Sequence, residues 1–174
     1  GTSFSERQFA KLAIEGELAV ELATDLKAHA TTLAELNTAV AAIFPVIELH
    51  NFVFRGAQPS APELIANNAI HAGYVYPTNS QAEQTLDVYP GTLRIEVDGQ
   101  ELATVASEQL TATVISSLRW LSQELERTGT GLKAGQTVLC GSVADLFPVH
   151  SNCRINVISE HLGTVDCTVN ESTP

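Results

Sequence analysis

The clearest alternation of apolar and polar side chains in the sequence runs over residues 13–22, which read AIEGELAVEL. Positions two apart fall on the same side of an extended strand, so this segment predicts one apolar side and one mainly acidic side. The apolar side consists of Ile14, Leu18, Val20 and Leu22, and the other side of Glu15, Glu17, Ala19 and Glu21. We therefore expect a strand here with one face in the core.

A second strand with a carboxylate is expected after one intervening helix. Thr32 and Glu35 have the spacing of a capping box, and apolar residues follow at helical intervals, so a helix is predicted to run to Ile43. Residues 45–54, PVIELHNFVF, then predict a strand in which Glu48 stands among apolar neighbours. An unpaired carboxylate is costly to bury at such a position.

The middle of the chain predicts shorter elements. Pro62 suits a first helical turn, which predicts a short helix through the residues ELIANNA that follow it. A strand is expected at residues 73–76, and the polar residues 77–91 predict a surface loop. Asp98 and Gly99 lie between two apolar segments and predict a two-residue hairpin, because both central positions of a type I′ turn need a positive φ.

The rest of the sequence predicts one long helix and further strands. Apolar residues recur at helical spacing from Leu110 to Leu125, which marks an amphipathic helix. Strands are expected at residues 137–143 and on both sides of a short turn within residues 154–169. Strands joined by hairpins, with a few helices among them, favour an α+β architecture with antiparallel or mixed sheet over a doubly wound parallel sheet.

Composition predicts a single domain covering residues 1–174. With 44% hydrophobic and 17% charged residues, the chain has the apolar content of a folded core. Nine basic residues against twenty acidic ones give a net charge of -11, which repels phosphate backbones and anionic lipids, so we expect no nucleic acid and no membrane as partner. No apolar stretch approaches the ~20 residues that cross a bilayer, and a soluble, cytoplasmic protein is expected. Because Gly1-Thr2-Ser3 has the composition of a cloning remnant, loss of an upstream segment stays open.

The three cysteines allow two interpretations. Cys140, Cys153 and Cys167 form no closely spaced metal-ligand pattern, and an odd number cannot all pair within one chain. Buried free thiols are the simpler interpretation. A bridge between Cys153 and Cys167 is the alternative, since both lie in predicted strands.

Four segments in order carry a resemblance to a known family: IEGELAVEL (14–22), PVIELHN (45–51), PELIANNA (62–69) and LKAGQTVLCGSVADLFPV (132–149). Together they resemble the metal-binding, C-terminal part of the 2-keto-4-pentenoate hydratase branch of the fumarylacetoacetate hydrolase family. The resemblance runs over nearly the whole chain. It implies a rolled mixed β-sheet with flanking helices, a Mg2+ or Mn2+ ion held at Glu15, Glu17 and Glu48, and assembly into a homo-oligomer.

The chemistry of these residues agrees with a cation. Glu15 and Glu17 lie about 7 Å apart along one face of a strand, close enough for their side chains to converge. Two such charges repel by roughly 3 kcal/mol at about 6 Å and an effective dielectric of 20, and a hard dication removes that cost. The alternative is an ordinary strand whose glutamates face water.

The resemblance also implies a reaction. It implies hydration, decarboxylation or carbon–carbon hydrolysis of small 2-oxo acids, with the metal stabilising an enolate, and substrate contacts at Asn68, Cys140, Gly141 and Ser142. The sequence departs from the family pattern at Asn67, where aspartate is usual, at Ile70, where a small hydroxyl residue is usual, and at Cys140, where threonine is common. A thiol is a weaker donor than a hydroxyl, so a bound acid would be held less firmly.

No catalytic residue is identified from the sequence. The family uses a lysine well upstream of the Glu-x-Glu strand, and Lys11, four residues before Glu15, does not match it. His50 and His71 are candidates for a substitute acid/base, because imidazole titrates near neutrality, and structural roles for both are the alternative. A catalytically inactive family member that serves as a binding or assembly protein is therefore the second hypothesis.

Overall fold

The computed structural model describes residues 1–28, 30, 32–56, 58–77, 86 and 91–171, and its strands form two five-stranded sheets. The first sheet has the order β1 (Thr2–Ser5), β10 (Gly163–Asn170), β9 (Cys153–Ser159), β5 (Leu93–Val97) and β6 (Gln100–Val105). The second has the order β4 (His71–Val75), β3 (Val40–Asn51), β2 (Leu12–Leu22) and β7 (Thr137–Leu139), with β8 (Phe147–Pro148) also beside β2. Among the described strands, β1 and β10 alone pair in parallel, and the other pairs are antiparallel.

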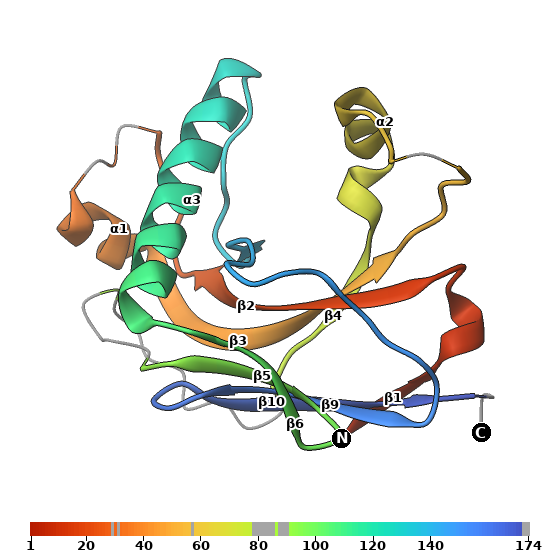
Figure 1. The fold of residues 1–174 in the computed structure, drawn as a ribbon. Coiled ribbons are helices and arrows are strands. Elements are labelled where there is room, and N and C mark those ends of the chain that lie inside the picture. The colour runs from red at the N-terminus through yellow and green to blue at the C-terminus, as the bar shows by residue number, and fades with distance from the viewer. Residues whose placement is uncertain (29, 31, 57, 78–85, 87–90, 172–174) are drawn as a thin grey trace.

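The helices lie around the second sheet. They are α1 (Leu33–Ala39), α2 (Ala61–Ala66) and α3 (Ser107–Arg127), with short 3-10 turns at η1 (Glu6–Gln8) and η2 (Asn68–Ile70). Figure 1 shows the two sheets stacked, with α2 and α3 rising on either side above β2 and β3. The predicted α+β architecture with a rolled mixed sheet is confirmed. None of the helices in the described residues is both long enough and apolar enough to cross a bilayer.

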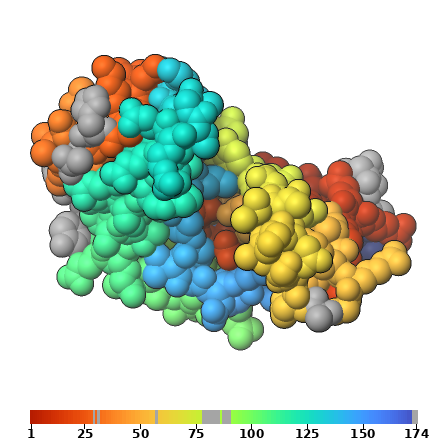
Figure 2. All heavy atoms as spheres, turned by 90° about the horizontal axis from the view of Figure 1, so that it is seen from above, coloured from red at the N-terminus to blue at the C-terminus, as the bar shows by residue number. Residues whose placement is uncertain are grey.

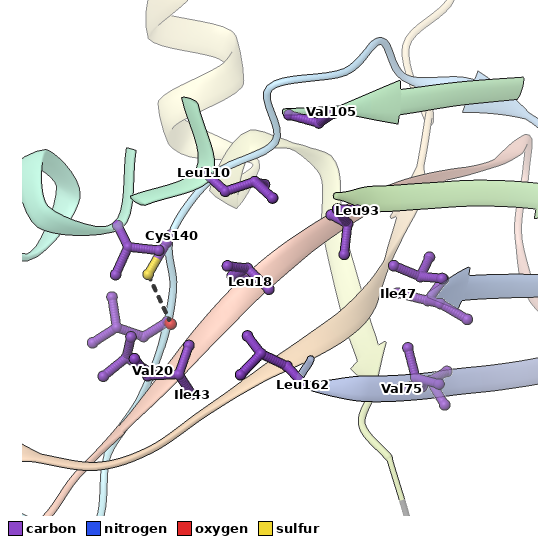
Figure 3. Close-up of a cluster of buried hydrophobic side chains, with 14 of the residues drawn as sticks. Leu18, Val20, Ile43, Ile47, Val75, Leu93, Val105, Leu110, Cys140 and Leu162 are labelled. Carbon is purple, nitrogen blue, oxygen red and sulfur yellow. Dashed lines mark hydrogen bonds between the residues drawn. The ribbon is translucent and has the colours of Figure 1, made fainter. Parts of the chain in front are cut away.

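The hydrophobic core lies between the two sheets. The alternating apolar side of β2 faces inward, and Ile14 and Val20 are completely buried. Figure 3 shows Leu18 of β2, Ile47 of β3 and Leu93 of β5 in this core. Because one face of β2 is committed to the core, the strand's register with its neighbours is fixed, and its glutamates must face the other way.

Local signals placed several elements correctly. The capping box at Thr32 forms, with its hydroxyl and the Glu35 carboxylate bonding to each other's backbone N–H. The predicted hairpin turn also forms, with φ of 52° at Asp98 and 78° at Gly99. The long helix buries Leu110, Val114, Leu118 and Ser122.

The predicted helix end at Ile43 was wrong. The helix ends at Ala39, and β3 begins directly at Val40. Val40 and Ile43 pair with residues of β2, so strand pairing overrides the helical spacing of these apolar residues. Residues 52–54, expected to be strand, lie outside β3.

Other boundaries differ as well. The strand expected at 137–143 ends at Leu139, and β1 and β8 are strands that the sequence pattern did not predict. The predicted loop at 77–91 lies mostly outside the described residues.

All three cysteines are buried free thiols, so the alternative of a bridge between Cys153 and Cys167 was wrong. The two residues lie on adjacent strands but are not opposite each other. Cys153 pairs with Val169, and Cys167 pairs with Ile155.

Candidate metal centre

The three predicted carboxylates lie on the face of β2 and β3 that points away from the core. Glu15 stands directly opposite Glu48 in the antiparallel pairing of these strands, and Glu17 stands opposite Val46. Side chains of directly opposed residues project to the same face with Cβ atoms about 4.5–5.5 Å apart. The fold therefore brings together glutamates that are more than thirty positions apart in the sequence.

This face is open to solvent between two helices. Figure 2 looks down on it and shows a hollow between α3, in teal, and α2, in yellow. Parts of the red and orange strands and of the blue segment after β7 form the floor. A small molecule could therefore approach the sheet at this point.

Two histidines contact the carboxylates. His50 Nε2 lies 3.2 Å from Glu15 Oε2 and 3.5 Å from Glu48 Oε2, and His71 Nδ1 lies 2.6 Å from Glu48 Oε1. One ligand atom each from Glu15, Glu48 and His50 lies within 4.8 Å of the others. This spacing is compatible with three ligands around one metal ion.

Glu17 is the most deeply buried residue of the cluster, with only 1% of its surface exposed. Its Oε2 accepts a hydrogen bond from the backbone N–H of Gly141. Gly141 has a φ of 89°, a conformation that favours glycine and that turns the chain away from β7. Glu17 Oε1 is buried and receives no hydrogen bond from any described donor. The carboxyl faces that of Glu48, and the two can share a hydrogen bond only while one carries a proton.

Burial raises the pKa of Glu17 to about 9, and the hydrogen bond and negative charge of Glu48 act in the same direction. For Glu48, burial also acts to raise the pKa, but hydrogen bonds with His50, Glu17 and His71 outweigh it and lower the pKa to about 2. Burial acts to lower the pKa of His50, and its hydrogen bonds with Glu15 and Glu48 outweigh this and raise it to about 9. At neutral pH and without a cation, Glu17 and His50 therefore each carry a proton. A bound dication could displace these two protons.

We expect the stability of the cation-free protein to fall as the pH rises from about 5 to about 9. In the unfolded state Glu17 has its ordinary pKa of 4.5 and loses its proton over this window, whereas in the folded state it keeps the proton. The free energy of unfolding therefore falls as the pH rises. His50 acts in the same sense, since its stabilisation is complete below pH 6.5 and is lost by about pH 9. Thermal melts across this range in a chelator test the expectation. A flat profile would contradict it, and saturating Mg2+ should reduce the decline.

Comparison with known proteins finds similar sequences and similar folds. No family model matches the sequence. The 2-keto-4-pentenoate hydratase of Burkholderia vietnamiensis is 26% identical over 158 residues, which cover 91% of this chain and 60% of the hydratase. Among solved structures, the 4-oxalocrotonate decarboxylase from Pseudomonas putida G7, complexed with magnesium and adipate, has a TM-score of 0.84 at 20% identity and covers 97% of this chain and 64% of that one. These likenesses support the resemblance of this chain to the fumarylacetoacetate hydrolase family.

A second solved structure has the same fold. The fumarylpyruvate hydrolase from Pseudomonas aeruginosa, in complex with Mn2+ and pyruvate, has a TM-score of 0.68 at 13% identity and covers 98% of this chain and 70% of that one. The chain spans about 60% of the length of the curated hydratases that it matches.

Two of the predicted substrate contacts lie beside the carboxylates. Gly141 donates its N–H to Glu17, and Ser142 Oγ lies 3.4 Å from the carbonyl oxygen of Gly16. Gly16 is the residue between Glu15 and Glu17, so the segment after β7 passes directly over the Glu-x-Glu strand.

The other two predicted substrate contacts are not brought to the carboxylates. Cys140 is 3% exposed, and its thiol lies 3.6 Å from the carbonyl oxygen of Val138 and points into the core, as Figure 3 shows. Burial also raises its thiol pKa, which makes it unreactive. Asn68 is exposed, has a φ of 50° and, in the described part of the chain, makes no hydrogen bond to the cluster.

The departures from the family pattern have structural counterparts. Ile70, which replaces a small hydroxyl residue, is 7% exposed and ends a turn whose three residues all have positive φ. Its apolar side chain is therefore packed away rather than offered to a ligand. The ammonium of Lys11 lies 5.4 Å from the centre of the Phe52 ring, where it can make a cation–π contact.

His50 is a potential metal ligand that the sequence pattern did not predict as one. Glu48 and His50 are two residues apart on β3, as Glu15 and Glu17 are on β2, so each strand presents two potential ligands on one face. This Glu-x-His spacing is a signal that the sequence already contained.

Proposed function

We propose that this chain is the metal-binding part of an enzyme that acts on small 2-oxo acids, with Glu15, Glu17 and Glu48 holding a divalent cation within a single domain of residues 1–174. The observation that carries the proposal is the buried Glu17 Oε1, which receives no hydrogen bond from the described residues. Ionising this carboxyl without a donor for the buried oxygen is costly, and a cation shared with Glu15 and Glu48 would stabilise the ionised form.

The donor set suits Mg2+ or Mn2+. Carboxylate oxygens are ligands that these hard ions prefer, and three protein ligands leave coordination positions for water or substrate. The relatives support this choice, because the similar decarboxylase was solved with magnesium and the similar hydrolase with Mn2+ and pyruvate. When bound, the ion would supply Lewis-acid polarisation of a keto oxygen.

The surrounding residues would orient the carboxylates and handle protons. Gly141 fixes one Glu17 oxygen through its backbone N–H, which leaves the other free to face the ion. His50 contacts both Glu15 and Glu48, and His71 contacts Glu48, so the two histidines help to hold these carboxylates in place. The His71 side chain is 27% exposed, so it is the more accessible histidine for proton exchange with a ligand. Ser142 would lie at the edge of the site near Gly16.

Mg2+ or Mn2+ should raise the melting temperature, because a ligand that binds only the folded state stabilises it. At a cation concentration one hundred times the dissociation constant, the free energy of unfolding rises by about 2.7 kcal/mol. For a chain of this size, the melting temperature then rises by roughly 5–10 °C. A small 2-oxo acid such as pyruvate should add a further shift only when the cation is present. Calorimetry with NaCl at matched ionic strength is the control, and the absence of a cation-specific shift would refute the site.

The second candidate is a family member that binds the ion and ligand without turnover. It is favoured by the position of Lys11, whose ammonium is directed at Phe52. NMR detection of exchange between the C3 hydrogens of a 2-oxo acid and solvent deuterium separates the two candidates. Cation-dependent exchange supports the enzyme, whereas cation-dependent binding without exchange supports the binding protein.

A further inference from the structure

Two tyrosines extend the carboxylate row toward the edge of the sheet. Tyr74 of β4 stands directly opposite Glu48 in the pairing of β3 with β4, and Glu48 in turn stands opposite Glu15. The three residues therefore form one row across three strands on the same face. Val75, the next residue along β4, points to the other face and is 5% exposed in the core.

The tyrosine rings offer an accessible aromatic surface beside the cluster. Tyr74 is 40% exposed and Tyr76 is 62% exposed, and their ring centres lie 6.5 Å apart. Tyr76 is the first residue after β4, and its ring lies beside that of Tyr74, so the two rings form one aromatic surface. Exposed aromatic side chains next to converging polar groups are typical of ligand sites, because the rings bury apolar parts of a ligand.

The charges around the cluster disfavour a second anionic group on the ligand. In the described structure, the ion pairs of Glu15 and Glu48 are with His50 and His71, not with lysine or arginine. All nine lysine and arginine residues lie within the described ranges. Four of them pair with acidic residues outside the cluster: Arg94 with Glu96, Arg127 with Glu124, Lys133 with Asp25, and Arg154 with Asp166.

Charge counting points the same way. Three carboxylates and one dication leave a net charge of about -1 before any ligand binds, by simple addition of the formal charges. One ligand carboxylate can be accommodated by direct contact with the cation. A second carboxylate, held away from the cation, would meet the remaining negative charge of the cluster and the aromatic surface of Tyr74.

We propose that Tyr74 and Tyr76 bind the uncharged tail of a 2-oxo acid, and that the site accordingly selects 2-oxo monocarboxylic acids over 2-oxo dicarboxylic acids. This inference rests on the metal-dependent function proposed above. It adds Tyr74 as a specificity-determining residue, because its position opposite Glu48 places it next to any ligand that reaches the cation.

The test compares two probes of similar length, 2-oxopentanoate and 2-oxoglutarate, by calorimetry in saturating Mg2+. The wild-type protein should bind 2-oxopentanoate at least about tenfold more tightly, in keeping with the cost of an unpaired charge. Tyr74→Ala should weaken 2-oxopentanoate binding by about tenfold, whereas Tyr74→Phe should retain it because the ring face makes the contact. Tyr74→Arg should shift the preference toward 2-oxoglutarate.

Trp120→Ala provides the matched control, since Trp120 is a 64% exposed aromatic residue on α3. It should leave both affinities unchanged. Stabilisation by Mg2+ alone, measured for each variant, reports whether the fold and the cation site survive. Two outcomes would overturn the inference while the proposed function stands. In the first, Mg2+ stabilises all the variants, and Tyr74→Ala binds both acids as tightly as the wild type does. In the second, the wild type prefers 2-oxoglutarate. If the wild type responds to neither Mg2+ nor the acids, both are overturned.

Discussion

Glu17→Gln is expected to abolish stabilisation by Mg2+ or Mn2+ while leaving the cation-free protein at least as stable as the wild type. Glutamine keeps the shape of the side chain, and its amide oxygen can still accept the N–H of Gly141. Its amide nitrogen can donate to the Glu48 carboxylate, which faces it. It cannot provide a carboxylate to a cation.

The gain in the cation-free state follows from the pKa of Glu17. With a pKa of about 9 in the folded state and 4.5 as the ordinary value, the folded protein at neutral pH holds a proton that the unfolded chain releases. Glutamine removes this cost, which we expect to raise the free energy of unfolding by about 1–3 kcal/mol at pH 7. Loss of one of three carboxylate ligands should weaken cation affinity by at least about 100-fold, or about 2.7 kcal/mol.

Thermal melts and calorimetric titration with and without Mg2+ measure both effects. Glu21→Gln is the matched control, because Glu21 lies on the same face of β2 but is exposed and pairs with Ala42, away from the cluster. It should keep the full response to the cation. If Glu17→Gln retains the wild-type shift with Mg2+, Glu17 is not a ligand and the proposed site needs a different third group.

Gly16→Val is expected to destabilise the protein by more than about 3 kcal/mol, and Gly16→Ala by about 1–3 kcal/mol. A Cβ atom at Gly16 would lie 2.7 Å from Ile95 Cγ1 and 3.0 Å from Val157 Cγ2, both in the opposing sheet. Ile95 is completely buried, so it has no solvent-filled space into which to move. The glycine therefore sets how closely the two sheets approach.

The same substitution should also disturb the cation site, since Gly16 lies between Glu15 and Glu17 on β2. Chemical denaturation measures the loss of stability, and Gly131→Ala is the control, because a Cβ there would meet nothing within 4 Å. Combining Gly16→Ala with Ile95→Ala should recover part of the stability lost by the two single changes, with a coupling of about 1 kcal/mol or more. Strict additivity of the two changes would show that close packing at this contact is not the cause.

For the glutamates of β2, the sequence alone predicts the face on which they lie but not how deeply they are buried. Alternation showed that Glu15 and Glu17 leave the core together, because period-two patterning needs only neighbours along one strand. It did not show that Glu17 is 1% exposed, since the atoms that cover it come from Gly141 and Glu48, far away in the chain. Burial at this position is a property of three packed segments.

Helix and strand boundaries illustrate the same limit. Leu36, Val40 and Ile43 satisfy a helical interval, yet only Leu36 is helical in the structure. Pro45, which was expected to follow a helix, lies inside β3, where it pairs with Leu18 of β2. In the described residues β4 pairs only with residues 47–50 of β3, so Pro45 has a partner strand on one side only, a position in a sheet that tolerates proline.

The sequence by itself determined the elements whose signals are local: the alternating strand of residues 13–22, the capping box at Thr32, the hairpin at Asp98-Gly99 and the long amphipathic helix. Each depends on dihedral preferences or on contacts within a few residues. Tertiary structure alone decided which strands pair, and hence that Glu48 faces Glu15, that His50 joins them and that Tyr74 completes the row. Strand register results from burying the apolar side of every strand at once, so no single segment contains that information.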